Sequence, residues 1–300
     1  MTESTPLQNR TWKLWERPEK PQPINIQPRD AAIMLAVARH HFIQPHHLHA
    51  LFGDPLHKLA LRTRKLWQNG YLDRPMAIRP TRVLTDQMVY CLTNKGAREL
   101  ERRDPNLHIS KLQWSERPDD PTKLVNVEHQ LGVATFFVML QVACTKLGYR
   151  LHWDGHLDRD RHFVYFRREN KYINSDGFFV LERSDGMKRR FFLEFDRTGR
   201  KKPDRVYEKL LRYFNWWDSG EAEELLPHGA FRVLVVVPTE KHMQTLRRAT
   251  TPIGRERNPQ TWRGFMFSHL EAFSPTYAER ILAEPIFYHA DDDTPVSLIS

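Results

Sequence analysis

The most constraining feature of the chain is a nearly continuous apolar run, FRVLVVV, at residues 231–237. A run of this kind is typical of a strand that is buried on both faces of a sheet. Segments with helical spacing stand before and after it, at 204–217 and 241–249, and a short strand is predicted at 265–267. This alternation of helices and strands predicts an α/β fold for the second part of the chain.

A second strand, predicted at 190–196 (RFFLEFD), carries two carboxylates two positions apart, Glu194 and Asp196. Because side chains alternate along a strand, both carboxylates lie on the same face. Two acids on a mostly buried strand repel each other and lose hydration, so they need a cation, a base or shifted pKa values. Asp176, on a strand predicted at 172–182, would complete an oxygen-rich site for magnesium or manganese, able to activate water beside a phosphodiester.

The pattern of these acids resembles the PD-(D/E)xK nuclease superfamily. The resemblance rests on Asp176, on Glu194-x-Asp196 eighteen positions later, and on a following helix with Lys209 and Tyr213 four positions apart. It implies a restriction-endonuclease-like mixed-sheet domain in which Asp176, Glu194, Asp196 and Lys209 are catalytic. The three acids are then the expected ligands of a magnesium or manganese ion.

Two positions depart from the superfamily pattern. Ser175 stands where the superfamily has proline, which only shapes the backbone there. Asp196 stands where the superfamily has a lysine that orients water or stabilises developing charge, and a carboxylate cannot supply that positive charge. Three alternatives stay open: Lys209 reaches the site from its helix, Asp196 adds a metal ligand, or the site is inactive and its acids pair with Arg197 or Arg200.

A long amphipathic helix is predicted at 124–147, and Glu128 and His129 lie near its start. Glu128 is a candidate for a further metal ligand and His129 for a general base. The alternative is an acid that complements the helix dipole beside an ordinary histidine.

The first third of the chain has the element order of a winged helix-turn-helix. Helices begin at Asp30 and Pro45, a third spans 56–69, and two strands at 71–74 and 83–93 enclose a basic loop. In such a fold the third helix enters the major groove of DNA and the wing contacts phosphate or the minor groove. The residues that this arrangement assigns to DNA binding are Lys58, Arg62, Arg64 and Lys65 on the helix, with Arg79 and Arg82 on the wing.

Charge and composition narrow the function classes. The formal net charge is +9, and residues 1–105 hold 17 basic and 10 acidic side chains, so most of the excess lies in the first third. This distribution favours a polyanionic partner, here double-stranded DNA. We expect no membrane span and a cytoplasmic protein, because no long apolar run, signal peptide or CxxC pattern is evident. GxSxG, HExxH and P-loop patterns are also missing from the sequence.

A proline-rich, charged stretch without apolar periodicity marks the boundary between two domains. The chain is therefore expected to have five segments. They are a proline-rich lead at 1–28, a winged helix domain at 29–103, a linker at 104–123, a nuclease-like domain at 124–290 and an acidic tail at 291–300.

From about Asp30 onward, the chain resembles the bacterial replication-relaxation family. The winged module, the segment HQLGVATFFVML and the strand-turn FFLEFDRTG carry this resemblance. It implies a DNA-binding protein of a plasmid or mobile element that acts in replication, relaxation or transfer, with metal-dependent nicking by the second domain and with replication or transfer proteins as partners. The alternative is a non-catalytic regulator or accessory factor with a degenerate nuclease core. The oligomeric state is left open, and a dimer is compatible with the pattern.

Overall fold

The computed structural model describes residues 16–75, 88–109, 122–153, 155, 157, 163–196, 203–226, 230–251, 253, 264–273 and 278–299. The chain has a mixed α/β fold, as the sequence predicts, and divides into two units at residues 1–138 and 139–300. Arg79, Arg82, Arg197 and Arg200 lie outside the described residues, so the predictions made for them stay predictions.

In the described part of the first unit, three helices are followed by two short strands and a fourth helix. The antiparallel pair of strands joins Leu72 to Leu92 and Asp73 to Cys91. Gly53 adopts a left-handed conformation, φ 72°, which ends the second helix and which glycine adopts without steric cost. The elements are α2 (Pro28–His40), α3 (Pro45–Phe52), α4 (Leu56–Gln68), β1 (Leu72–Asp73), β2 (Cys91–Leu92) and α5 (Asn94–Arg103).

Helix α2 begins two residues before the position expected from the sequence. Gln27 is the N-cap residue, and Asp30 accepts a hydrogen bond of 2.7 Å from the Gln27 backbone N–H in a capping box. Asp30 therefore caps the helix from its third position, and its carboxylate is completely buried.

Helix α6 (Thr122–Leu147) is the longest of the described helices, and the division between the units falls within it. By length and composition only, its stretch Val127–Leu147 is apolar and long enough to cross a membrane. More than half of that apolar window, 56%, is buried inside the protein, as in the core helix of a soluble protein.

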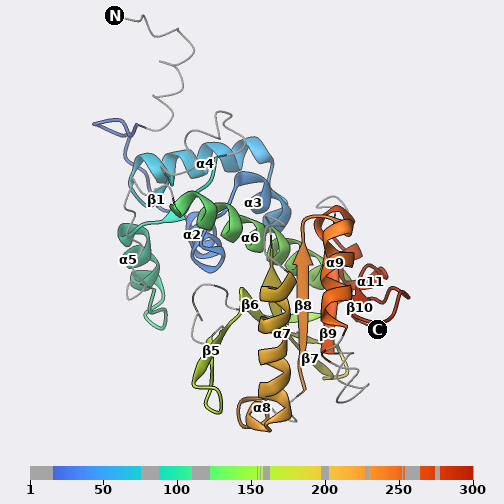
Figure 1. Ribbon diagram of the computed structural model, residues 1–300. Coiled ribbons are helices and arrows are strands. Elements are labelled where there is room, and N and C mark those ends of the chain that lie inside the picture. The colour runs from blue at the N-terminus through green and yellow to red at the C-terminus, as the bar shows by residue number, and fades with distance from the viewer. Residues whose placement is uncertain are drawn as a thin grey trace, which may run out of the picture. The chain divides into compact units, whose positions relative to one another are not determined.

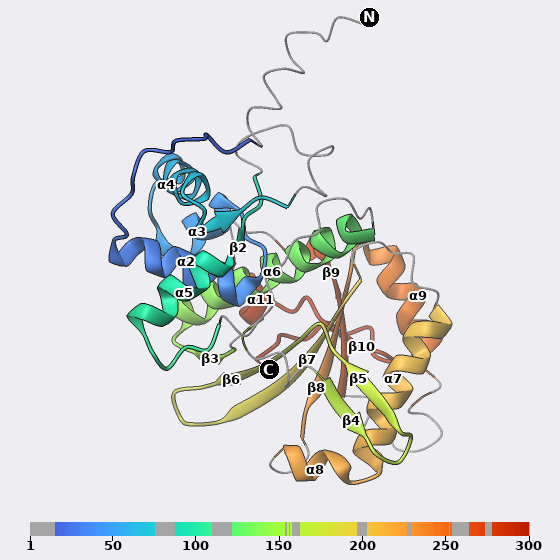
Figure 2. The ribbon, with the colours of Figure 1, turned by 90° about the vertical axis from the view of Figure 1, so that its left-hand side faces the viewer.

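A six-stranded mixed sheet forms the centre of the second unit (Figures 1 and 2). Its strand order is β10-β9-β8-β7-β6-β3, with β7, β8 and β9 parallel and the outer neighbours antiparallel. The apolar run of the sequence becomes β8 (Arg232–Val237), and both of its neighbours are parallel to it. The other strands are β3 (Arg150–His152), β6 (Gly177–Glu182), β7 (Lys188–Phe195), β9 (Phe265–His269) and β10 (Tyr288–His289).

The strand predicted at 172–182 is two strands in the structure. Its first part, β5 (Lys171–Asn174), pairs with β4 (Phe163–Phe166) in a separate antiparallel hairpin, whereas β6 joins the main sheet. Ser175 and Asp176 form the step between the hairpin and the sheet, so Asp176 precedes a strand instead of lying inside one.

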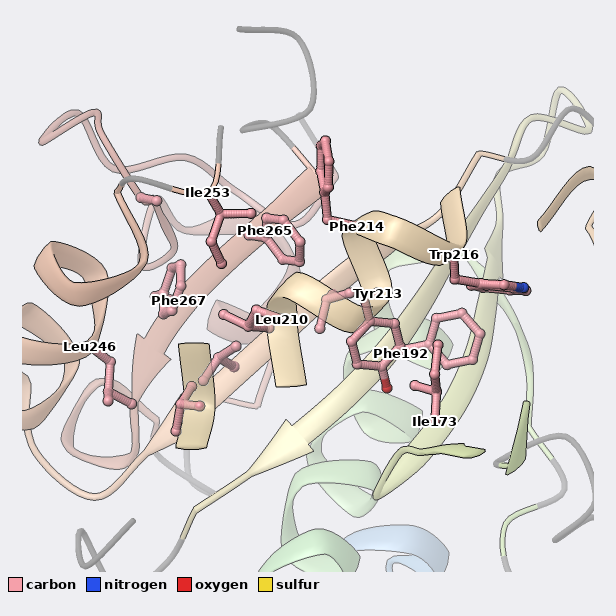
Figure 3. Close-up of a cluster of buried hydrophobic side chains, with 14 of the residues drawn as sticks. Ile173, Phe192, Leu210, Tyr213, Phe214, Trp216, Leu246, Ile253, Phe265 and Phe267 are labelled. Carbon is pink, nitrogen blue, oxygen red and sulfur yellow. The ribbon is translucent and has the colours of Figure 1, made fainter. Parts of the chain in front are cut away.

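Helices α7 (Pro203–Asp218) and α9 (Glu240–Thr250) pack on one face of the sheet around a large apolar cluster (Figure 3). In this cluster Phe192 of β7 contacts Tyr213 and Trp216 of α7, with ring centroids 5.4 and 6.0 Å apart. Since Phe192 lies two residues before Glu194, the helix-covered face of β7 is also the face of the two predicted acids. The remaining described elements are α8 (Glu221–Leu225), the 3-10 turn η6 (Leu270–Ala272) and α11 (Arg280–Ala283).

Candidate functional site

Glu194 is a buried carboxylate near the carboxyl end of β7, held by two side chains from α7. The Lys209 ammonium forms an ion pair with Oε2, and the Tyr213 hydroxyl donates a hydrogen bond of 2.8 Å to Oε1. Lys209 and Tyr213 are four residues apart and therefore share one face of the helix. Glu194 itself is only 5% exposed.

Asp176 reaches the same end of β7 from the neighbouring chain segment. Its backbone N–H donates to the Leu193 carbonyl at 2.9 Å, and its Oδ2 accepts from the Phe195 backbone N–H at 2.8 Å. These two bonds place the acid beside Glu194, and the charge of Asp176 acts on the titration of Glu194.

Asp196 follows the last residue of β7 and pairs with a residue of another helix. Its backbone N–H donates to the Val236 carbonyl of β8 at 2.8 Å, and the His242 Nε2 lies 3.3 Å from its Oδ2. His242 lies in the first turn of α9, where its backbone N–H donates to the hydroxyl of the N-cap residue Thr239 at 3.3 Å.

A pocket of about 240 Å³ opens between the carboxyl end of the sheet and the two helices. Both cations of α7 that line it, Arg205 and Lys209, are four residues apart and share a helical face. The lining residues are Glu194, Asp196, Arg205, Val206, Lys209, Leu210, Val235 and Leu246.

Burial dominates the electrostatics of Glu194 and Tyr213. Burial is the main cause that raises the pKa of Glu194, and the charge of Asp176 raises it further, while Lys209 and Tyr213 act in the opposite direction. Burial and the neighbouring Glu194 carboxylate also hold the pKa of Tyr213 well above its ordinary value. Tyr213 is therefore a hydrogen-bond donor at neutral pH.

Among the described residues, no three His, Cys, Asp or Glu side chains are grouped so as to hold a metal ion. Asp176 and Glu194 nevertheless provide hard oxygen donors next to each other. Magnesium commonly takes only one or two protein carboxylates and completes its coordination with water and substrate phosphate, so this donor set fits such an ion. Glu128 lies on α6 in the first unit, and its predicted part in the site stays a prediction.

The structure separates the predicted DNA-binding residues of α4 into two groups. Lys58, Arg64 and Lys65 are exposed. The Arg62 guanidinium instead forms a bidentate ion pair with the buried Asp30 of α2 and donates to the Asn25 carbonyl at 3.1 Å.

Sequence reasoning brought Asp176, Glu194 and Lys209 to one site but missed His242 and Arg205. A signal for His242 was present, because β7 and β8 are parallel and the residues that follow both strands meet at one edge. Arg205 precedes Lys209 by one helical turn, and that spacing alone places it on the same face.

The fold and this pocket define the protein as a mixed α/β protein with an acid pair and a helix-borne lysine at the carboxyl end of parallel strands. The model of the replication-relaxation family matches residues 35–233, about two thirds of the chain, and the chain belongs to this family. That membership gives it a role in replication or relaxation and is consistent with DNA interaction. No curated protein and no solved structure matches the chain significantly.

Proposed function

We propose that this chain is a DNA-binding protein of a plasmid or other mobile element that acts in replication, relaxation or transfer, and that its second unit nicks DNA with a metal ion. The observation that carries this proposal is the meeting of Asp176, Glu194 and Lys209 at the carboxyl end of β7, where Glu194 and Lys209 line the pocket. The family membership supports the process, and the pocket supports the chemistry.

Lys209 is positioned to replace the lysine that the nuclease pattern has where this chain has Asp196. Its ammonium reaches Glu194 from α7, so a positive charge is present at the acid pair although it comes from a different element. A phosphodiester in the pocket would meet Lys209 and Arg205, whose charges offset the charge that develops on the phosphate oxygens during cleavage.

The other residues of the pocket have supporting roles in this proposal. The Tyr213 hydroxyl fixes the Glu194 carboxylate, and His242 fixes Asp196 at the turn after β7. Asp176 and Glu194 would hold the metal ion, which would supply an activated water and an electrostatic contact to the phosphate.

The first unit would hold duplex DNA through the exposed face of α4. Lys58 and Lys65 lie seven residues apart, two helical turns, and so present their charges along one side of the helix. Arg64 lies next to Lys65 and adds a third exposed charge. Such contacts to phosphate position a protein on DNA without specifying a sequence.

Relaxation of supercoiled plasmid to open circle tests the proposal, with magnesium, manganese or EDTA and on plasmids with and without the native mobile-element sequence. We expect nicking with metal by the wild type, and a loss of at least about 100-fold in Asp176→Asn and Glu194→Gln. Glu208→Gln is the matched control, since Glu208 is an exposed acid of α7, and it should nick normally. Absence of nicking by the wild type on every plasmid would contradict the catalytic part of the proposal.

A second function, a non-catalytic regulator or accessory factor, is favoured by a different observation. Both oxygens of Glu194 already accept hydrogen bonds from side chains of the protein. Such partners satisfy a buried carboxylate that has no catalytic role. The same assay separates the two functions, because the regulator would bind duplex DNA with full affinity and leave every plasmid supercoiled.

A further inference from the structure

The β4–β5 hairpin has one buried and one exposed face, and the exposed face is aromatic. Val164 and Ile173 face each other across the strands and are buried in the cluster with α7. Tyr165 and Tyr172 are the next pair, 43% and 60% exposed, with ring centroids 5.0 Å apart. Figure 2 shows this hairpin as a ribbon separate from the six-stranded sheet.

The charges around the tyrosine pair are unequally neutralised. Arg167, in the turn, is paired with Glu221 and Glu224 of α8, and Glu169 is paired with Arg212 of α7. Two further cations of the hairpin, Arg168 and Lys171, are exposed. Their side chains have no ion pair with any residue in the described part of the chain. Lys171 pairs with Phe166 and so lies on the other face of β5 from Tyr172, at its turn end, and Arg168 lies in the turn itself. The turn end of the hairpin is thus left with a net positive charge.

The same hairpin continues directly into the candidate site. Strand β5 ends at Asn174, and Ser175 and Asp176 follow before β6 begins. A nucleic-acid strand bound along the hairpin would therefore lie on a protein segment that ends at Asp176, beside Glu194.

We propose that the Tyr165–Tyr172 face of this hairpin is a binding surface for single-stranded DNA, on which an unpaired base stacks while Arg168 and Lys171, at the turn end of the hairpin, contact the backbone. Exposed aromatic rings beside cations are the usual means of binding unpaired strands without sequence preference. Duplex bases are already stacked on one another, so the rings favour a strand whose bases are free. The proposal rests on the proposed function in one respect, since relaxation exposes unpaired bases next to a nick.

Binding of a fluorescein-labelled single-stranded 20-mer and of its duplex, followed by anisotropy in EDTA, tests the inference without any catalysis. We expect the double variant Tyr165→Ala/Tyr172→Ala to lose about tenfold or more in single-strand affinity while duplex affinity is unchanged. Tyr165→Phe/Tyr172→Phe should retain binding, because stacking needs the ring and not the hydroxyl. Met187→Ala is the control, since Met187 is an equally exposed apolar residue, 47%, outside the hairpin.

Three results would overturn the inference: wild-type single-strand affinity in the alanine double variant, an equal loss in the phenylalanine variant, or an equal loss in Met187→Ala. Sedimentation of the same samples tests whether a second copy of the chain binds this face instead. Self-association that disappears in the alanine variant, with single-strand affinity unchanged, would assign the face to a second copy of the chain. The binding readout is independent of metal. If the alanine double variant lost single-strand binding and the wild type never nicked a plasmid, this inference would be retained and the catalytic proposal rejected.

Discussion

Replacement of Arg62 by alanine separates the structural and DNA-binding residues of α4. Its partner Asp30 is 0% exposed, and among the described residues the replacement leaves this carboxylate with the Gln27 backbone N–H as its remaining hydrogen-bond donor. Breaking a buried ion pair costs about 3–5 kcal/mol, and since the Arg62 side chain is 25% exposed we expect about 3 kcal/mol. Lys65→Ala, on the exposed face of the same helix, should change stability by less than about 0.5 kcal/mol.

Hydrogen exchange of the α2 and α4 amides measures this difference in the full chain. A loss of about 3 kcal/mol corresponds to roughly 100-fold faster exchange, because each 1.4 kcal/mol is a factor of ten. The double variant Asp30→Ala/Arg62→Ala should lose less than the sum of the two single variants, since it removes the unpaired charge together with its partner. The reasoning would be refuted if Arg62→Ala exchanged like the wild type and reduced DNA affinity as strongly as Lys65→Ala.

Three further outcomes follow from the structure. Burial raises the pKa of Glu194, so its contribution to stability is present below the ordinary value of 4.5 and is lost as pH rises through the folded pKa. Glu194→Gln should therefore gain stability over the wild type as pH rises. A difference between the two that is independent of pH in urea unfolding would contradict this. Duplex affinity should fall steeply with salt, and Lys58→Ala/Lys65→Ala should lower the slope of log K against log salt by about 1.8; an unchanged slope would remove α4 from the DNA interface. Trp216→Ala, which leaves a cavity at a fully buried position, should lower the free energy of unfolding by about 3–5 kcal/mol. Trp217→Ala, at a partly exposed position, should lower it by less than about 1 kcal/mol. Equal losses in thermal unfolding would contradict the assigned core.

The sequence predicted those parts of the fold that depend on local periodicity. The apolar run of β8, the acid-bearing strand β7 and the faces of α7 each follow from the spacing of their own residues. The proximity of Lys209 to Glu194 could also be predicted, because one face of the helix packs on one face of the strand.

The features that sequence analysis missed depend on contacts between distant segments. The step at Ser175 interrupts no alternation of apolar residues, and only the pairing of β5 with β4 shows that the chain changes sheets there. Likewise Arg62 has the spacing of a surface cation, and its burial against Asp30 depends on how α2 packs on α4.

In the proposed function, Lys209 supplies the positive charge which the nuclease pattern places at the position of Asp196. The most direct test is the rate of plasmid nicking with manganese for Lys209→Met, which keeps the length of the side chain and removes its charge, against Asp196→Asn. We expect a loss of about 100-fold or more for Lys209→Met. Asp196→Asn, which keeps the contact to His242 through its amide oxygen, should lose less than about tenfold. Normal nicking by Lys209→Met, or a larger loss in Asp196→Asn, would contradict the account.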